Sequence, residues 1–173
     1  GEAARRGIVA ETGNDAVRVE RLDVSSPASI AGFVERLDAG VVDILVHSAG
    51  VLPDERVVTP EGLELTVATN LAGPMRLTAA LRGRLLASSD ARVVMITSGG
   101  MYPRRLSVRR LTTLEGPFDG VKAYADTKRA MVVLTEQLAE RFAGTAVTVH
   151  TMHPGWADTP AVQTSIPRFH QMT

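Results

Sequence analysis

Four stretches of the chain repeat their hydrophobic residues with the spacing of an amphipathic helix. The first stretch ends before Gly13, and glycine commonly follows the last turn of a helix. The second stretch begins with a serine and a proline, which favour a first helical turn. The four predicted helices cover residues 2–12, 25–40, 60–88 and 121–143.

Four shorter stretches alternate with these helices and are predicted to be β-strands. The first alternates apolar and polar residues, whereas the second is a short apolar run of the kind found in strands buried on both faces. Strands separated by helices predict an α/β fold, a doubly wound parallel sheet with right-handed crossovers, in a single domain over residues 1–173. The predicted strands cover 17–24, 42–50, 91–100 and 146–155, and the basic segment 101–120 is expected to be irregular.

Composition narrows the classes of function. Nineteen basic residues balance nineteen acidic ones, so no net charge favours nucleic acid or an acidic membrane surface. The chain has no cysteine, which excludes disulfides and thiolate catalysis and fits a reducing compartment. No apolar run approaches the ~20 residues of a membrane span, and the start lacks a signal-peptide pattern. These features predict a soluble, cytoplasmic chain.

His150 and His153 lie three apart on a predicted strand and would point to opposite faces, so no metal site is expected.

Polar residues and glycines collect at the carboxyl ends of the predicted strands, where open parallel sheets bind their ligands. We therefore expect a site built from these strand ends, which are Asp23, 47–50, 97–100 and 153–159.

Tyr124 and Lys128 lie four residues apart in the last predicted helix. At about 100° per residue they fall within about 40° of each other and continue the apolar stripe. An unpaired buried ammonium is costly, so the lysine needs a polar partner or a ligand. A neighbouring ammonium also favours phenolate and would lower the tyrosine pKa from its usual value of about 10. The pair is predicted to be an acid–base site.

Pro74 lies inside the predicted helix 60–88 and has no N–H for the carbonyl of Asn70. The helix should be distorted there and offer a free carbonyl and an amide side chain. A plain proline kink filled by water is the alternative.

Together these residues resemble the short-chain dehydrogenase/reductase family. The resemblance rests on Y-x-x-x-K at 124–128, Ser98, Asn70, "HSAG" at 47–50, "LDVSS" at 22–26 and "PGWADT" at 154–159. It implies that Tyr124 is the general acid that protonates a carbonyl oxygen and that Lys128 binds the nicotinamide ribose. It also implies that Ser98 binds the substrate oxygen and that Asn70 holds a water linked to Lys128.

The resemblance further implies that NAD or NADP is the cofactor, with a slight preference for NADP. Asp23 would accept from the adenine amino group with Val24 against the ring, and residues 154–159 would line the nicotinamide pocket. The implied cofactor-binding residues are Asp23, Val24, His47, Ala49, Gly50, Tyr124, Lys128, Pro154, Gly155, Trp156 and Thr159.

Two departures from the family pattern stand out. His47 occupies a position where the family usually has asparagine, and imidazole can still form a hydrogen bond there. Ser98 and Tyr124 are 26 residues apart, about double the spacing of compact members. The added segment resembles that of retinol-dehydrogenase-like members and of the group called SDR family member 12. Its arginines at 104, 105, 109 and 110 could meet an acidic substrate or phosphate, but a solvated loop is favoured. Tyr102 lacks a lysine four residues later and is not chosen as the acid.

The glycine-rich phosphate fingerprint of dinucleotide-binding folds is absent from this sequence. We therefore expect an N- and C-terminally truncated, partial Rossmann-type domain that lacks the family's first two strands and its last. Either the strand at 17–24 pairs directly with 42–47, or both keep open edges that are prone to association.

The function predicted is an NAD(P)-dependent oxidoreductase that interconverts a small-molecule carbonyl and an alcohol. A nucleotide-sugar epimerase or dehydratase shares Y-x-x-x-K, but "HSAG" and "PGWADT" favour the reductase. A catalytically silent remnant that only binds a partner is the alternative from another class. A homo-oligomer formed through the helices at 60–88 and 121–143 is also left open.

Overall fold

The computed structural model describes residues 1–155, and its centre is a parallel sheet of three strands in the order β1-β2-β3. These are β1 (Ile44–His47), β2 (Ala91–Ile96) and β3 (Val147–Met152). Ile44 is paired with Arg92, and Ala91 with Val147, so the carboxyl ends of all three strands lie at one edge. The predicted order of parallel strands separated by helices is confirmed.

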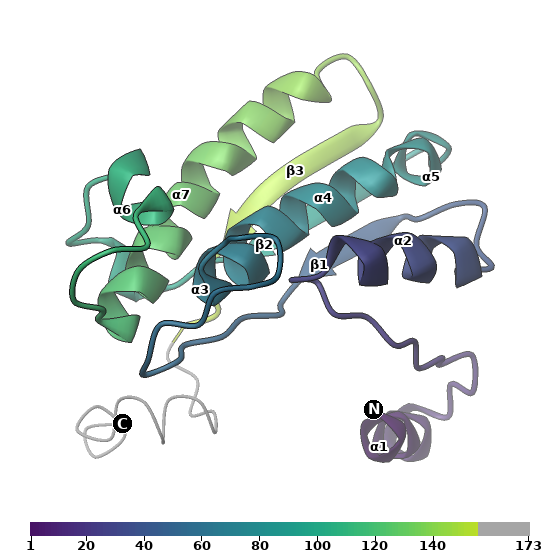
Figure 1. The fold of residues 1–173 in the computed structure, drawn as a ribbon. Helices are drawn as coiled ribbons and strands as arrows, with labels where there is room; N and C mark the ends of the chain where they lie inside the picture. Colours follow the sequence, from purple (N-terminus) through teal and green to yellow (C-terminus); the bar gives the residue numbers. More distant parts are fainter. Residues whose placement is uncertain (156–173) are drawn as a thin grey trace.

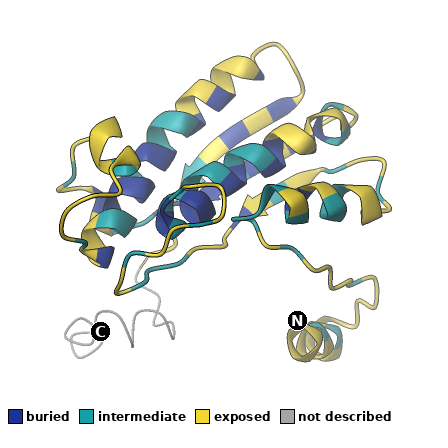
Figure 2. Cartoon of the chain, viewed as in Figure 1, coloured by how far each residue is buried: buried dark blue, intermediate teal, exposed yellow. Residues whose placement is uncertain are grey.

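Three helices pack over one face of this sheet: α2 (Pro27–Arg36), α4 (Gly73–Ala80) and α7 (Gly120–Arg141) (Figure 1). The side chains of β2 alternate accordingly, with Val93 and Met95 buried beneath the helices and Arg92 exposed on the other face. Figure 2 shows the buried residues gathered between the helices and the sheet. The core consists of Ile30, Leu77, Leu81, Leu85, Ala91, Val93, Met95, Met131, Leu138, Phe142, Val147 and Val149.

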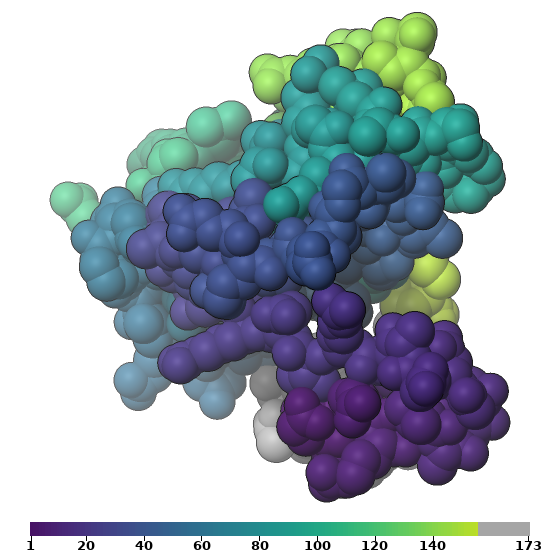
Figure 3. Space-filling view, turned by 90° about the vertical axis from the view of Figure 1, so that its right-hand side faces the viewer, coloured from purple at the N-terminus to yellow at the C-terminus, as the bar shows by residue number. Residues whose placement is uncertain are grey.

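Helix α1 (Glu2–Thr12) forms as predicted and ends at Gly13, whose φ of 69° is the left-handed conformation that glycine adopts without strain. None of its residues is buried. In the space-filling view the N-terminal segment forms a lobe beside the rest of the chain (Figure 3). The Nε atom of Arg5 donates to the Val17 carbonyl at 2.7 Å, which ties α1 to the segment that follows it.

The strand predicted at 17–24 does not form, because a strand needs a hydrogen-bonded neighbour and no described segment pairs with it. The outer edge of β1 is therefore free of any described strand. Ile44 and Val46 are 61% and 52% exposed, so the prediction that this strand is buried on both faces was wrong. Neither arrangement expected for these two segments forms as stated, because 17–24 is not a strand and, of the two, only β1 keeps an open edge.

The predicted helix at 60–88 is broken into shorter pieces. A helical turn at α3 (Leu65–Val67) leads into a π-helical turn, η1 (Ala68–Ala72), followed by α4 and by α5 (Arg82–Leu86). The N–H of Gly73 donates to the Ala68 carbonyl, five residues back, just before Pro74. The distortion expected at this proline thus takes the form of a π turn, a feature that often marks functional sites.

The segment 101–120 is less irregular than expected. It begins in a 3-10 helix, η2 (Gly99–Met101), and contains a short helix, α6 (Val108–Thr112), capped by the Ser107 hydroxyl. Helix α6 has five residues, too few to reveal a hydrophobic period in the sequence. Asp119 caps the start of α7 by accepting from the Lys122 N–H at 3.0 Å.

Among the described residues, no helix combines the length and apolar character needed to cross a membrane.

Candidate active site

The four predicted catalytic residues meet beside the carboxyl end of β2. Ser98 follows this strand, and its side chain lies near enough to the Tyr124 phenol to lower the pKa of that phenol. The Nζ atom of Lys128 donates to the Ile96 carbonyl at 2.6 Å and lies 5.4 Å from the centroid of the Tyr124 ring. A Cβ placed on Gly50 would lie 3.5 Å from Oδ1 of Asn70 and 3.9 Å from Nζ of Lys128, so both side chains flank this glycine.

Lys128 is only 3% exposed although it carries an ammonium group. Burial disfavours the charged form and lowers the pKa of Lys128 to about 8. The Ile96 carbonyl accepts from one of its three N–H groups. The predicted placement of this lysine on the buried face of its helix is therefore confirmed, and its amine can exchange a proton near neutral pH.

The pKa of Tyr124 differs from our expectation. Burial raises the pKa of Tyr124 above its usual value, and the Ser98 side chain lowers it by less. The sequence predicts that the Lys128 ammonium lowers this pKa below its usual value. The prediction fails in this structure because burial of the phenol outweighs the other influences on its ionisation.

Asn70 holds the turn that follows β1. Its Oδ1 accepts from the Val51 N–H at 2.8 Å, and its Nδ2 donates to the Val51 carbonyl at 3.0 Å. Nδ2 also reaches Oγ1 of Thr127 at 3.4 Å, next to Lys128 on α7. The buried amide therefore joins the π turn, the loop after β1 and the helix that carries the Tyr–Lys pair.

His47 is buried at the end of β1 and has a structural partner. Its Nε2 lies 2.8 Å from Oγ1 of Thr78, and that hydroxyl donates to the Pro74 carbonyl at 2.8 Å. A hydroxyl has one proton, so Thr78 accepts from Nε2–H of a neutral imidazole. Burial lowers the pKa of His47 to about 4. The His47 side chain thus contacts α4, and its assignment to a cofactor stays a prediction.

The other predicted cofactor residues within 1–155 lie in loops and turns. The Oδ1 atom of Asp23 accepts from the N–H and the hydroxyl of Ser25, which shapes the turn before α2. The Val24 carbonyl packs against Gly73. Ala49, Gly50, Pro154 and Gly155 are exposed, and Trp156 and Thr159 lie outside the described residues.

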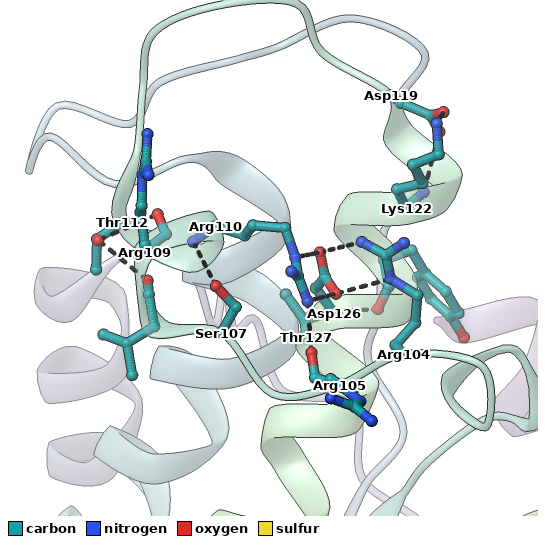
Figure 4. Close-up of polar contacts among 12 residues, drawn as sticks. Arg104, Arg105, Ser107, Arg109, Arg110, Thr112, Asp119, Lys122, Asp126 and Thr127 are labelled. Carbon is teal, nitrogen blue, oxygen red and sulfur yellow. Dashed lines mark hydrogen bonds and ion pairs between the residues drawn. The ribbon is translucent and has the colours of Figure 1, made fainter.

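The sequence analysis did not predict which acidic residue pairs with the arginines of the segment 101–120. Arg104 and Arg110 both bind the carboxylate of Asp126, which lies between Tyr124 and Lys128 in the chain (Figure 4). Two of the four arginines are thus paired with an acid of α7 rather than solvated as expected. The available signal was an acid on the helix face opposite Tyr124, 22 and 16 residues from two arginines.

The basic segment has a second anchor at its far end. Nη1 of Arg56 donates to the carbonyls of Leu114 and Gly116, each at 2.8 Å, and its guanidinium lies 5.3 Å from the Phe118 ring centroid. Between the two anchors is a cavity of about 460 Å³, and none of the four predicted catalytic residues lines it.

Tyr102, the tyrosine not chosen as the acid, is 75% exposed. The described residues contain no group of three or more metal-ligating side chains.

The sequence matches a family model described as enoyl-(acyl carrier protein) reductase over residues 2–173. Dehydrogenase/reductase SDR family member 12 from Homo sapiens is 39% identical over 170 residues, which is 98% of this chain and 53% of that protein. Retinol dehydrogenase 13 from Mus musculus is 34% identical over 160 residues, or 91% of this chain and 48% of that protein. The chain belongs to the short-chain dehydrogenase/reductase family, as predicted. It spans about half the length of the curated relatives it matches.

Solved structures agree with this assignment. A crystal structure of a protein from Mycobacterium paratuberculosis has a TM-score of 0.78 at 29% identity. The match covers 94% of this chain and 57% of the chain in that structure. A short-chain dehydrogenase from Burkholderia cenocepacia in complex with NADP has a TM-score of 0.68 at 25% identity. The match covers 92% of this chain and 60% of the chain in that structure. The predicted Rossmann-like α/β class, of which this chain covers part, is confirmed.

Proposed function

We propose that this chain contains the catalytic part of an NAD(P)-dependent oxidoreductase. Its catalytic residues are Tyr124, Lys128, Ser98 and Asn70. One observation supports the proposal most. Lys128 is buried with a pKa of about 8 and its Nζ lies 5.4 Å from the ring centroid of Tyr124, whose raised pKa is lowered in part by the Ser98 side chain that follows β2. A core that served only for packing would gain nothing from a buried amine. Perturbed ionisable groups in such a cluster are typical of catalytic sites.

In the reducing direction Tyr124 would donate its phenolic proton to the oxygen of a carbonyl. Ser98, already within hydrogen-bonding reach of the phenol, would orient that oxygen. Lys128 would supply the proton that restores the phenol, because its amine exchanges protons near pH 8. The reverse sequence would take a proton from an alcohol. A bound nicotinamide supplies the hydride in the first direction and accepts it in the second.

The residues around Gly50 fit the nicotinamide end of such a cofactor. Gly50 is exposed and lies between the amide of Asn70 and the ammonium of Lys128. The Ile96 carbonyl accepts from one N–H of Lys128, and ribose hydroxyls would accept from others. The Burkholderia neighbour is solved in complex with NADP, which supports NAD(P) here and favours NADP only slightly.

The proposal is tested by adding NADPH and NADH separately to the chain and following nicotinamide fluorescence. We expect saturable binding and turnover of a ketone or aldehyde. Tyr124→Phe should abolish turnover and leave cofactor affinity within about twofold, because the phenol acts on the substrate oxygen. Tyr102→Phe is the matched control and should change neither. Absence of saturable binding would show that this chain is not itself an active reductase.

A second candidate function is binding without catalysis, and the exposed edge of β1 favours it. Ile44 and Val46 are exposed there, beside backbone groups that no described strand pairs. The two functions differ in the cofactor experiment, since a binding module needs no nicotinamide.

A further inference from the structure

The carboxylate of Asp126 is held from two sides by arginines of the inserted segment. Nε and Nη2 of Arg104 donate to its two oxygens at 2.9 and 2.8 Å, and Nε and Nη2 of Arg110 do so at 2.9 and 3.1 Å. Figure 4 shows Arg104 and Arg110 approaching Asp126 from opposite sides. Asp126 is 6% exposed, whereas the side chains of Arg104 and Arg110 are 23% and 44% exposed, so water screens these paired bonds in part.

Asp126 lies on the rear of the helical turn that carries the site. It follows Tyr124 by two residues and precedes Lys128 by two. At about 100° per residue its side chain points about 200° away from that of Tyr124. The arginines therefore hold α7 from the side opposite the reacting groups.

The chain between Ser98 and Arg104 is hydrogen-bonded at successive steps. The Met101 N–H donates to the Ser98 carbonyl at 3.2 Å, and the Tyr102 N–H donates to the Gly99 carbonyl at 3.1 Å. The Arg104 N–H donates to the Met101 carbonyl at 2.9 Å. A displacement of Arg104 would therefore be transmitted along η2 to Ser98.

These contacts close a ring. It runs from Asp126 through about half a turn of α7 to Tyr124, from the phenol to the neighbouring Ser98 side chain, along η2 to Arg104 and back to Asp126. Both ends of the segment 98–104 are thus attached to α7, one at the front of the helix and one at the rear. Because the Ser98 hydroxyl is already held in place, no conformational entropy is lost in ordering it when a substrate binds.

We propose that Asp126 is a positioning residue: held by Arg104 and Arg110, it fixes the segment 98–104 on α7 and so keeps the Ser98 hydroxyl at Tyr124. The proposal rests on the proposed function only in assigning the reaction to Tyr124. The simpler role, in which Asp126 merely orders α6 and its surroundings, would leave Ser98 where it is after the ion pairs are lost.

Hydrogen exchange of the whole chain separates the two roles. Asp126→Asn keeps the shape of the side chain and removes its charge. We expect amide exchange at least tenfold faster both in 105–112 and in the turn 99–104, with β2 and β3 unchanged. Asp90→Asn is the matched control, because it removes an exposed pair with Arg92 and should alter neither segment. Faster exchange in 105–112 alone, with 99–104 unchanged, would overturn the proposal.

A second measurement reads the phenol directly. The chain has two tyrosines, so Tyr102→Phe leaves Tyr124 as the only one that titrates in the ultraviolet. Ser98→Ala should raise its titration midpoint, because the Ser98 side chain favours phenolate. Asp126→Asn should raise it in the same direction by ~0.5 pH unit or more, and the double variant should add nothing further. A midpoint unchanged by Asp126→Asn would contradict the proposal.

Arg110→Gln offers a milder disruption if Asp126→Asn does not fold, since Arg104 keeps its pair with Asp126. It should shift both readouts in the same directions by smaller amounts, and no shift in either would equally overturn the proposal. Neither readout needs cofactor or turnover. A chain that binds no nicotinamide but shows the coupled shifts would refute the proposed function and leave the positioning role intact.

Discussion

Val51 and Asn70 exchange two hydrogen bonds, one from the Val51 N–H to Oδ1 at 2.8 Å and one from Nδ2 to the Val51 carbonyl at 3.0 Å. The asparagine side chain thus pairs with a loop backbone as a neighbouring strand would. This pairing sets the path of the chain after β1 and brings Gly50 alongside Lys128. Because it depends on one buried side chain, it can be tested by a single substitution.

Asn70→Ala should lower the free energy of unfolding by ~2–4 kcal/mol, because it leaves both polar groups of the Val51 backbone without their partner. Urea unfolding measures this change. The matched control is Asn14→Ala, since Asn14 is exposed and accepts one bond from the Ala16 N–H, so its loss should cost under about 1 kcal/mol. Equal effects of the two substitutions would contradict the role given to Asn70.

Lys128→Met should make the protein more stable at pH 7, although it removes a proposed catalytic group. The lowered pKa of Lys128, about 8 against a usual value of 10.5, measures the free energy that its buried charge costs. Methionine removes that cost but leaves the Ile96 carbonyl without its donor, so we expect a net gain of ~1–2 kcal/mol in urea unfolding.

The pH dependence supplies a second check on Lys128. The unfolded chain binds its proton up to pH 10.5 and the folded chain only up to about 8, so wild-type stability should rise between these values. Lys128→Met should lack this rise. Lys122→Met is the control at the other lysine, which is exposed and paired with Asp119, and it should keep the rise. A less stable Lys128→Met protein at pH 7 would argue against a costly buried charge.

His47 should make the protein less stable as the pH falls. Its folded pKa is about 4 and its usual value 6.5, so the unfolded chain binds more protons between these values. The free energy of unfolding should therefore decrease as the pH falls from 6.5 to 4, by on the order of 3 kcal/mol. His47→Gln should remove this component. The wild-type minus variant difference isolates it, because the carboxylates titrate in both proteins.

The helix periodicity of the sequence placed Tyr124 and Lys128 correctly, because α7 is long enough for its apolar stripe to be counted. The strand at 17–24 was predicted from its own alternation and did not form, since a strand is stable only beside another strand. The Asp126 contacts could not be predicted. Its two arginines come from a segment without periodicity, and only the folded path of η2 and α6 brings them to α7.

Two glycines in helices should respond oppositely to alanine. A Cβ on Gly73 would overlap the Val24 carbonyl, so Gly73→Ala must push the turn before α2 away from α4 and should cost ~2 kcal/mol or more. Gly83 lies in α5 with nothing within 4 Å of the added atom. Gly83→Ala should therefore stabilise by ~0.5–1 kcal/mol through helix propensity. Thermal unfolding compares the pair, and a destabilising Gly83→Ala would contradict the free space observed there.

The free edge of β1 should make the chain self-associate. Its backbone groups on that side have no strand partner among the described residues, and Val46 exposes an apolar side chain beside them. Sedimentation velocity should show a concentration-dependent increase in mass. Val46→Lys should reduce it, because a charged side chain on an edge strand opposes pairing with another chain.

Val108→Lys is the matched control for this edge. It makes the same substitution at an exposed valine on α6, away from the sheet, and should leave the association unchanged. Equal loss of association in both variants would point to a general effect of added charge. A chain that stays monomeric at all concentrations would instead show that the edge of β1 is protected. It would also weaken the case for a partner-binding function at that edge.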